Sequence, residues 1–277
     1  MNRSTDGAST AFVLGGGGIL GSVEVGMLQA LLQRGITPDL VVGSSVGALN
    51  GALVAAEPTI ETVARLRDVW IELNVGDVFS GSVLNRLSTL ARFGTHLHPN
   101  ESLRQLIESE LPGARIEDFP VRYQCVAASI ERAGPHWFVD GPVVDAVMAS
   151  CAVPGLFPPA AVGNEHFFDG GLVSSIPVGR AVQLGAKHIY VLQVGRIEQP
   201  LKVPRTPWEV GQVAFEIARR SRFVEDMANL PKGISVRSLP SGRPPGRVSH
   251  RSTGSTQDRI EQAYRASSQY LEALASD

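Results

Sequence analysis

The sequence predicts an α/β protein in which a mostly parallel sheet is covered by helices on both faces. A short apolar run at 11–14 leads through four glycines into a helical pattern at 24–34. The same order returns at once, because a strand at 40–42 precedes a turn and a helix at 46–56. Strands that alternate with helices are typical of parallel sheets, since each crossover helix packs on a face of the sheet.

Further patterns continue this alternation. Amphipathic helices are expected at 59–73 and 100–111, the second opened by Asn100 as its N-cap. Between them, the scattered apolar residues of 75–99 favour ordinary core packing over a flap above a site. Later strands are expected at 123–128, 136–139, 166–168 and 188–194, and later helices at 143–150, 178–184 and 208–229. We therefore expect a mixed sheet.

The chain divides into one main domain and C-terminal additions. Its 277 residues, 43% of them hydrophobic, suffice to bury the core of one such domain. The expected parts are the main domain at 8–200, a helix and strand packed on it at 201–239, a flexible linker at 240–256 and an amphipathic helix at 257–277. Ser255 and Asp258 match a capping box at the start of the last helix.

The charge balance argues against a nucleic-acid partner. The chain has 25 basic and 27 acidic residues, for a net charge of −2, so it lacks a broad positive field. Three arginines on the helix at 208–229, Arg219, Arg220 and Arg222, are expected to form a solvent-facing group.

Cysteine content and the N-terminus are typical of a cytoplasmic chain. Cys125 and Cys151 lie in apolar settings, so we expect two buried, reduced thiols. No apolar signal segment precedes the first strand, and the stretch at 40–56 is too short and too polar to span a bilayer. We therefore expect a cytoplasmic location, with peripheral contact with a membrane as an option.

A G-x-S-x-G pentapeptide stands between the second expected strand and the helix that follows it. It reads Gly43-Ser44-Ser45-Val46-Gly47. In such an elbow, glycines relieve crowding in the tight turn and the central serine is exposed at a helix N-terminus, which favours developing negative charge. The flanking strand and helix favour this interpretation over a glycine-rich packing turn, so Ser45 is the candidate nucleophile.

A second glycine-rich turn follows the first expected strand. Gly15 to Gly18 are consecutive glycines, and Gly21 closes the turn. Without Cβ atoms, several backbone N–H groups can converge on one oxygen, as an oxyanion hole requires. The alternative is a phosphate-binding loop, but no Gly-Lys-Ser/Thr follows and no ribose-binding acid ends the second strand.

Asp169 is the leading candidate for a catalytic base. It follows the apolar strand at 166–168 and precedes Gly170 and Gly171, so its carboxylate emerges at a strand end that backbone can approach closely. To act as a base toward the Ser45 hydroxyl, it needs partial desolvation that raises its pKa.

Other polar side chains are assigned structural roles. Asp140 is the second-ranked carboxylate, but the Pro142 that follows it indicates a helix start that Asp140 would cap. Asp145 suits the first turn of that helix. None of the six histidines stands at a convincing place for a Ser-His-Asp triad: His96, His98, His136, His166, His188 and His250. His96 and His98 lack further ligands, so neither a metal nor another cofactor is expected.

Together, the three motifs resemble the patatin-like phospholipases, which pair a glycine-rich oxyanion loop with a Ser-Asp dyad. The segment 149–159, ASCAVPGLFPP, is similar to that family's A-S-x-x-x-P-x-x-F-x-P segment between nucleophile and aspartate. The resemblance runs from about residue 11 to about residue 194. It implies a three-layer α/β/α sandwich with a mostly parallel central sheet.

The resemblance also implies a role for each motif. It makes Ser45 the nucleophile and Asp169 its base. The implied oxyanion donors are Gly16, Gly17, Gly18 and Val46, and the remaining motif positions are Gly15, Gly21, Gly43, Gly47, Gly170 and Gly171. Where the family commonly places Arg or Lys before the last loop glycine, this chain has Leu20, so electrostatic help from a cation at that position is absent, although the backbone donors do not depend on it.

The function implied is a serine esterase that hydrolyses acyl esters of lipids, phospholipid or lysophospholipid. A lipid acyl ester is the expected substrate, while headgroup, position of cleavage, transacylation and oligomeric state stay open. One alternative is a non-catalytic lipid-binding or interaction protein that keeps the fold, an option based on Leu20. Another is a nucleotide-binding module based on the glycine loop.

Overall fold

One mixed sheet lies at the centre of the computed structural model, which describes residues 10–75, 100–194, 200–242 and 255–276. Its strands run in the order β5-β6-β3-β2-β1-β7-β8, and β4 also pairs with β3. The strands are β1 (Thr10–Leu14), β2 (Leu40–Ser44), β3 (Arg122–Ser129), β4 (Gly134–Phe138), β5 (Ala160–Val162), β6 (Glu165–Asp169), β7 (His188–Leu192) and β8 (Ser235–Ser238). β1, β2, β3, β7 and β8 form the parallel part, whereas β4, β5 and β6 pair antiparallel. The mixed, mostly parallel sheet is confirmed.

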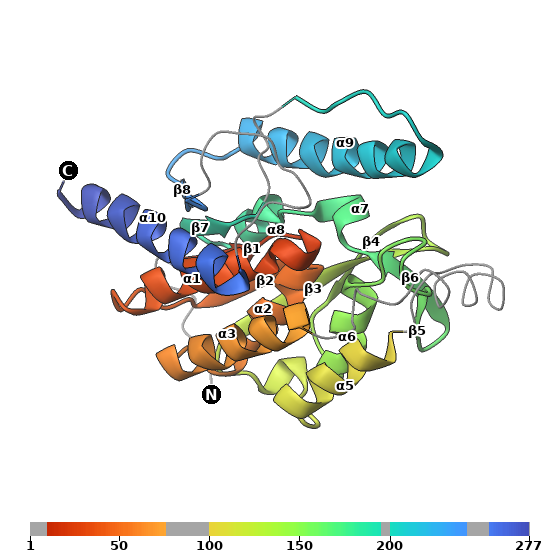
Figure 1. Ribbon diagram of the computed structural model, residues 1–277, viewed down its shortest axis with the longest axis horizontal. Helices are drawn as coiled ribbons and strands as arrows, with labels where there is room; N and C mark the ends of the chain where they lie inside the picture. The colour runs from red at the N-terminus through yellow and green to blue at the C-terminus, as the bar shows by residue number, and fades with distance from the viewer. Residues whose placement is uncertain (1–9, 76–99, 195–199, 243–254, 277) are drawn as a thin grey trace.

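Helices cover both faces of this sheet and complete three layers (Figure 1). One layer holds α1 (Ser22–Leu32), α2 (Val46–Ala56), α3 (Ile60–Val75), α5 (Glu101–Glu110), α6 (Val143–Ser150) and α10 (Thr256–Ser276). The other holds α7 (Gly171–Ser174), α8 (Val178–Gln183) and α9 (Pro207–Ala228); short 3₁₀ turns are η1 (Gly18–Gly21) and η2 (Ile116–Asp118). Phe12 and Leu14 of β1 pack into the first layer, whereas Ala11 and Val13 pack into the second, as strand alternation requires. The three-layer sandwich is confirmed.

The register of β3 brings two strand ends together. Along β3, Val126 pairs with Ser44 of β2 and the next residue, Ala127, pairs with Asp169 of β6. β4 pairs with both Val126 and Ala127, so it occupies one edge of β3, and β2 and β6 share the other edge end to end. Because β2 is parallel and β6 antiparallel to β3, their carboxyl ends meet. The sheet itself therefore places the residue after Ser44 beside Asp169.

The end of β1 lies next to the same point. Leu14 pairs with Gly43 of β2 on one side and with Leu192 of β7 on the other. The glycine turn that follows Leu14 therefore leaves the sheet beside the turn that follows β2. This is the edge where parallel α/β sheets commonly bind ligands.

Helix ends show where local sequence rules held. The helices expected at 46–56 and 143–150 have those bounds. The capping box is confirmed, because Ser255 N–H donates to Asp258 Oδ2 at 2.9 Å and Asp258 N–H donates to Ser255 Oγ at 3.1 Å. Asn100 occupies the N-cap position of α5, but its side chain makes no capping hydrogen bond.

The expected role of Asp140 as a helix cap is wrong. The N-cap of α6 is Pro142, and no side chain caps this helix. Residues 114–117 supply the acceptors at this helix start instead. Val143 N–H donates to Ala114 O at 3.0 Å, and Gly141 N–H donates to Glu117 Oε2 at 2.8 Å.

Two expected features fall largely on residues outside those that the structure describes. The segment at 75–99, weighed as core or flap, belongs to them from residue 76 onward, and the linker at 240–256 belongs to them over 243–254. Among the helices that are described, none combines the length and the apolar character needed to cross a membrane.

Candidate active site

Ser45 occupies a strained elbow between β2 and α2. Its backbone has φ 54° and ψ −128°, a left-handed conformation that is rare outside glycine and costs about 1–3 kcal/mol. α2 begins at the next residue, Val46, so the hydroxyl stands at the N-terminus of an eleven-residue helix. The expected strand, turn and helix around the G-x-S-x-G motif are confirmed.

The motif's two outer glycines let separate backbone segments meet beneath this elbow. A Cβ on Gly43 would lie 2.5 Å from Gly47 O, and a Cβ on Gly47 would lie 2.4 Å from Leu14 O. Either contact is far inside van der Waals distance, so a larger residue would push β1 and the elbow apart. The two glycines are a packing requirement that allows the strained turn.

Asp169 faces Ser45 directly. Ser45 Oγ donates to Asp169 Oδ2 at 2.6 Å, and Gly171 N–H donates to Asp169 Oδ1 at 2.7 Å. The carboxylate is the last residue of β6 and is 1% exposed. Each of its oxygens thus has a donor, which fixes one of them toward the serine.

The surroundings of Asp169 shift its proton affinity. Burial raises its pKa to about 6, although hydrogen bonds from Ser45 and Gly171 and the positive charge of Arg219 each act to lower it. At neutral pH the group is therefore mostly ionised, and it is a stronger base than an exposed aspartate. The desolvation that Asp169 requires to act as a base is therefore present.

Ser150, a residue to which the sequence argument gave no role, braces the elbow from behind. Ser45 N–H donates to Ser150 Oγ at 2.9 Å, and Ser150 Oγ donates to Val126 O at 2.7 Å. Gly170 N–H donates to Ser150 O at 3.1 Å, so the same residue also holds the turn after Asp169. Its signal was the segment at 149–159, in which Ser150 is the second residue.

In the glycine loop after β1, some backbone N–H groups have acceptors among the residues that the structure describes and others do not. Gly15 N–H donates to Leu192 O, and Gly16 N–H donates to Ser175 O, both at 2.9 Å. The Gly16 N–H was expected to donate to an oxyanion, but it already donates to Ser175 O. Within the part of the chain that the structure describes, no hydrogen bond engages the N–H groups of Gly17, Gly18 or Val46. These three remain as candidate donors.

Arg219 corrects the expectation that all three α9 arginines face solvent. It is 6% exposed, and its Nη1 donates to Gly16 O at 2.8 Å. Arg222, by contrast, is exposed. Exposure changes within a single turn of α9, and a run of charges alone does not reveal which member lies inside.

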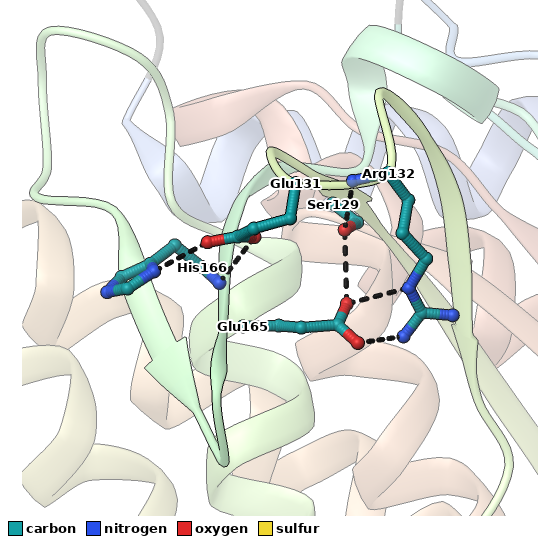
Figure 2. A network of polar contacts seen from close by, with 5 residues as sticks. All are labelled: Ser129, Glu131, Arg132, Glu165 and His166. Atoms are coloured by element: carbon teal, nitrogen blue, oxygen red, sulfur yellow. Dashed lines mark hydrogen bonds and ion pairs between the residues drawn. The ribbon is translucent and has the colours of Figure 1, made fainter.

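Several other carboxylates and histidines have partners other than Ser45 and Asp169. Figure 2 shows a network of them at the β3–β4 turn, where Glu131 accepts from the backbone N–H and ring Nδ1 of His166, and Glu165 accepts from Ser129 and Arg132. The side chains of His166 and Glu131 are both exposed.

Further members of this set are likewise engaged away from Ser45 and Asp169. The ring of His136 contacts Phe138 edge-on and Phe167 at a tilt, and Asp145 forms an ion pair with Arg104 at 3.5 Å. His96, His98 and His250 lie outside the described residues. No group of three or more His, Cys, Asp or Glu side chains within the described ranges could hold a metal ion.

A pocket of about 760 Å³ opens above the dyad. Ser45, Asp169 and the glycine loop line it together with apolar side chains and residues of α9. The wall residues include Leu20, Val153, Leu156, Leu172, Val194, Ala214, Phe215 and Ala218, and Arg219 lies among them. A volume of this size accommodates a flexible apolar ligand.

The region that contains this site is similar to known proteins. The sequence model of the patatin-like phospholipase family matches residues 12–182, which include both members of the dyad. The chain belongs to the patatin-like phospholipase family. The match ends before α9, so the patatin-like region alone does not contain Arg219.

Curated relatives and a solved structure agree with this placement. The chain is 31% identical over 205 residues to lysophospholipase nte1 of Aspergillus terreus and 32% identical over 207 residues to a patatin-like phospholipase domain-containing protein of Caenorhabditis elegans. Each match covers 72% of this chain but only 13% and 14% of those proteins. The structure of VipD from Legionella pneumophila has the same fold, with a TM-score of 0.52 and 15% identity over 96% of this chain and 67% of that one.

Replacing Ser150 by alanine tests the brace behind the elbow. We expect Ser150→Ala to lower the free energy of unfolding by about 1–3 kcal/mol, because the buried Ser45 N–H and Val126 O lose their partner. Thermal and denaturant unfolding measure this, with Ser109→Ala, at an exposed hydroxyl on α5, as the matched control. Equal stability of Ser150→Ala and Ser109→Ala would show that the strained elbow does not need the brace.

Proposed function

We propose that this chain is a carboxylic ester hydrolase that cleaves acyl esters of lipids through Ser45 and Asp169. The observation that carries the proposal is the 2.6 Å hydrogen bond from Ser45 Oγ to a buried Asp169, both of which line a mostly apolar pocket. Serine at a helix N-terminus, beside a carboxylate with a raised pKa, is a pattern typical of an activated nucleophile.

The first step is attack by Ser45. Asp169 Oδ2 accepts the hydroxyl proton while Ser45 Oγ forms a bond to the ester carbonyl carbon, and the carbonyl oxygen becomes an oxyanion. Because Asp169 Oδ1 keeps its hydrogen bond from Gly171, the carboxyl group holds its orientation through the transfer. The dyad needs no histidine for this geometry.

The second step is collapse of the tetrahedral intermediate. N–H groups of Gly17, Gly18 and Val46 are the proposed oxyanion donors, and the N-terminus of α2 adds a favourable field. The bond to the leaving alcohol breaks, and protonated Asp169 returns its proton to that alcohol. Water then attacks the acyl-enzyme with Asp169 as base, which releases the fatty acid and restores Ser45.

The lipid part of the proposal is supported by the pocket and by relatives. Apolar side chains dominate the walls, which suits a hydrocarbon chain better than a polar acyl group. Two of the relatives compared are described as a lysophospholipase and as a patatin-like phospholipase domain-containing protein. We propose phospholipid or lysophospholipid as the substrate class, and peripheral contact with a membrane surface as the way the substrate is reached.

A lipid panel tests nucleophile and substrate class together. We expect the wild type to release fatty acid from phospholipid or lysophospholipid, and Ser45→Ala to lose at least about 10³-fold in kcat, because no other group replaces the nucleophile. Fatty-acid release is measured across phospholipids, lysophospholipids and neutral acyl esters, with Ser109→Ala as the control. Activity of Ser45→Ala equal to that of wild type would refute the assignment, and a folded wild type inactive on every lipid would favour a non-catalytic binding protein.

The pKa of Asp169 predicts the acid side of the pH profile. Only the ionised carboxylate can accept the proton of Ser45, so kcat/KM should fall about tenfold per pH unit below about pH 6. The sign follows from burial, which raises the pKa and so moves the loss of activity to a higher pH than an exposed aspartate would give. Steady-state kinetics from pH 4.5 to 9 would check this, with enzyme stability verified at each pH. Full activity down to pH 4.5 would contradict a base with this pKa.

A further inference from the structure

Arg219 stands on α9, outside the region matched by the family, yet it reaches the glycine loop beside Ser45. It is the one arginine of the α9 group that is buried, and it lines the same pocket as Ser45 and Asp169. Burying a guanidinium is costly unless it is paired and hydrogen-bonded. Its partners therefore indicate what the structure gains from it.

The guanidinium is held by partners on two sides. Nε and Nη2 donate to the two carboxylate oxygens of Glu216 at 2.9 and 3.1 Å, in a forked ion pair within one turn of α9. Nη1 donates to Gly16 O at 2.8 Å. Glu216 thus fixes the orientation of the planar group, and the remaining nitrogen points at the loop.

The contact with Gly16 O controls the neighbouring N–H. A peptide unit is planar and trans, so the Gly16 carbonyl and the Gly17 N–H belong to one rigid plane and point in opposite directions. Gly16 N–H is also tied, to Ser175 O, and Gly17 O accepts from Leu20 N–H at 3.3 Å. The Gly16–Gly17 peptide is therefore held at its carbonyl by Arg219 and on both sides by backbone contacts.

The loop depends on such support because its own sequence gives the backbone great freedom. Four consecutive glycines can adopt many conformations, and rotation of a single peptide plane would replace an N–H donor by a carbonyl oxygen. A carbonyl directed at an oxyanion would repel it. Preorganised donors stabilise a developing charge because they do not have to turn during the reaction.

We propose that Arg219 is the positioning residue of the oxyanion loop. It holds the Gly16 carbonyl so that the Gly17 N–H faces the substrate carbonyl above Ser45, and it brings to the loop a positive charge that Leu20 does not supply. The inference rests on the proposed function, since it concerns how the same site stabilises its oxyanion. It assigns part of the site to α9.

The position of Arg219 also affects Asp169. The positive charge of Arg219 acts to lower the pKa of that buried carboxyl, so its removal should raise the pKa above about 6. Loss of packing between α9 and the sheet, without loss of a nearby positive charge, would leave this pKa unchanged. The acid limb of the pH profile therefore reports the positive charge near Asp169, whereas a fall in kcat at nearly constant KM reports the positioning of the loop.

The test compares Arg219→Met and Arg219→Lys with Arg222→Met, an exposed arginine on the same helix whose ion pairs are with Glu225 and Asp226. For Arg219→Met we expect kcat to fall about 10²-fold with KM within about threefold, because loop donors act mainly on the transition state. Its acid limb should move to higher pH. Arg219→Lys keeps the charge but loses the fork, so it should keep the acid limb near that of wild type while kcat stays low.

Several outcomes are decisive. Arg219→Met with the kcat and acid limb of wild type would overturn the inference, as would an equal fall in kcat for Arg222→Met. Thermal unfolding shows whether Arg219→Met is folded. If it is not, Arg219→Lys is the test, and a wild-type kcat in that variant would overturn the inference. Ser45→Ala is measured in parallel: hydrolysis that does not depend on Ser45 refutes the proposed function, whereas Ser45-dependent hydrolysis that is unaffected by Arg219→Met refutes this inference alone.

Discussion

The register of β3 is the constraint on which the candidate site depends. β2 and β6 share one edge of β3 end to end, so the elbow after Ser44 and the carboxylate of Asp169 meet without any long loop between them. A shift of either strand by one residue would turn its side chains to the opposite face. The hydrogen bond between Ser45 and Asp169 is thus a consequence of sheet pairing, and the rigidity of the dyad is that of the sheet.

The other half of the site comes from segments that the sheet does not order by itself. The loop after β1 is tied to Leu192 and Ser175 by backbone hydrogen bonds, and α9 adds Arg219 and one wall of the pocket. The Ser45–Asp169 pair and the pocket that it lines therefore have different structural origins. Changes in α9 can alter what the pocket accepts while the dyad stays in place.

Most helices and strands, and Ser45 and Asp169 as candidates at strand ends, could be predicted from the sequence because they follow local rules; that the two residues meet depends on the register of β3. Strand-turn-helix order, glycines at close approaches and the capping box at Ser255 act over a few residues. Three features could not be predicted, because they depend on tertiary contacts. At the start of α6, Ala114 O and the Glu117 carboxylate accept the hydrogen bonds, and Asp140 does not cap the helix. The Gly16 N–H donates to Ser175 O, and Arg219 is buried against the glycine loop. Leu20 places no cation in the glycine loop, yet the Arg219 guanidinium reaches the loop from α9.

Covalent labelling with a fluorophosphonate tests the central claim, that Asp169 activates Ser45, most directly. The reagent reacts with an activated serine and needs no assumption about the lipid. We expect one adduct per chain, located on Ser45 by mass spectrometry of the digested protein, and labelling slowed by orders of magnitude in Asp169→Asn. No adduct on the folded wild type, an adduct on another residue, or an unchanged labelling rate in Asp169→Asn would contradict it.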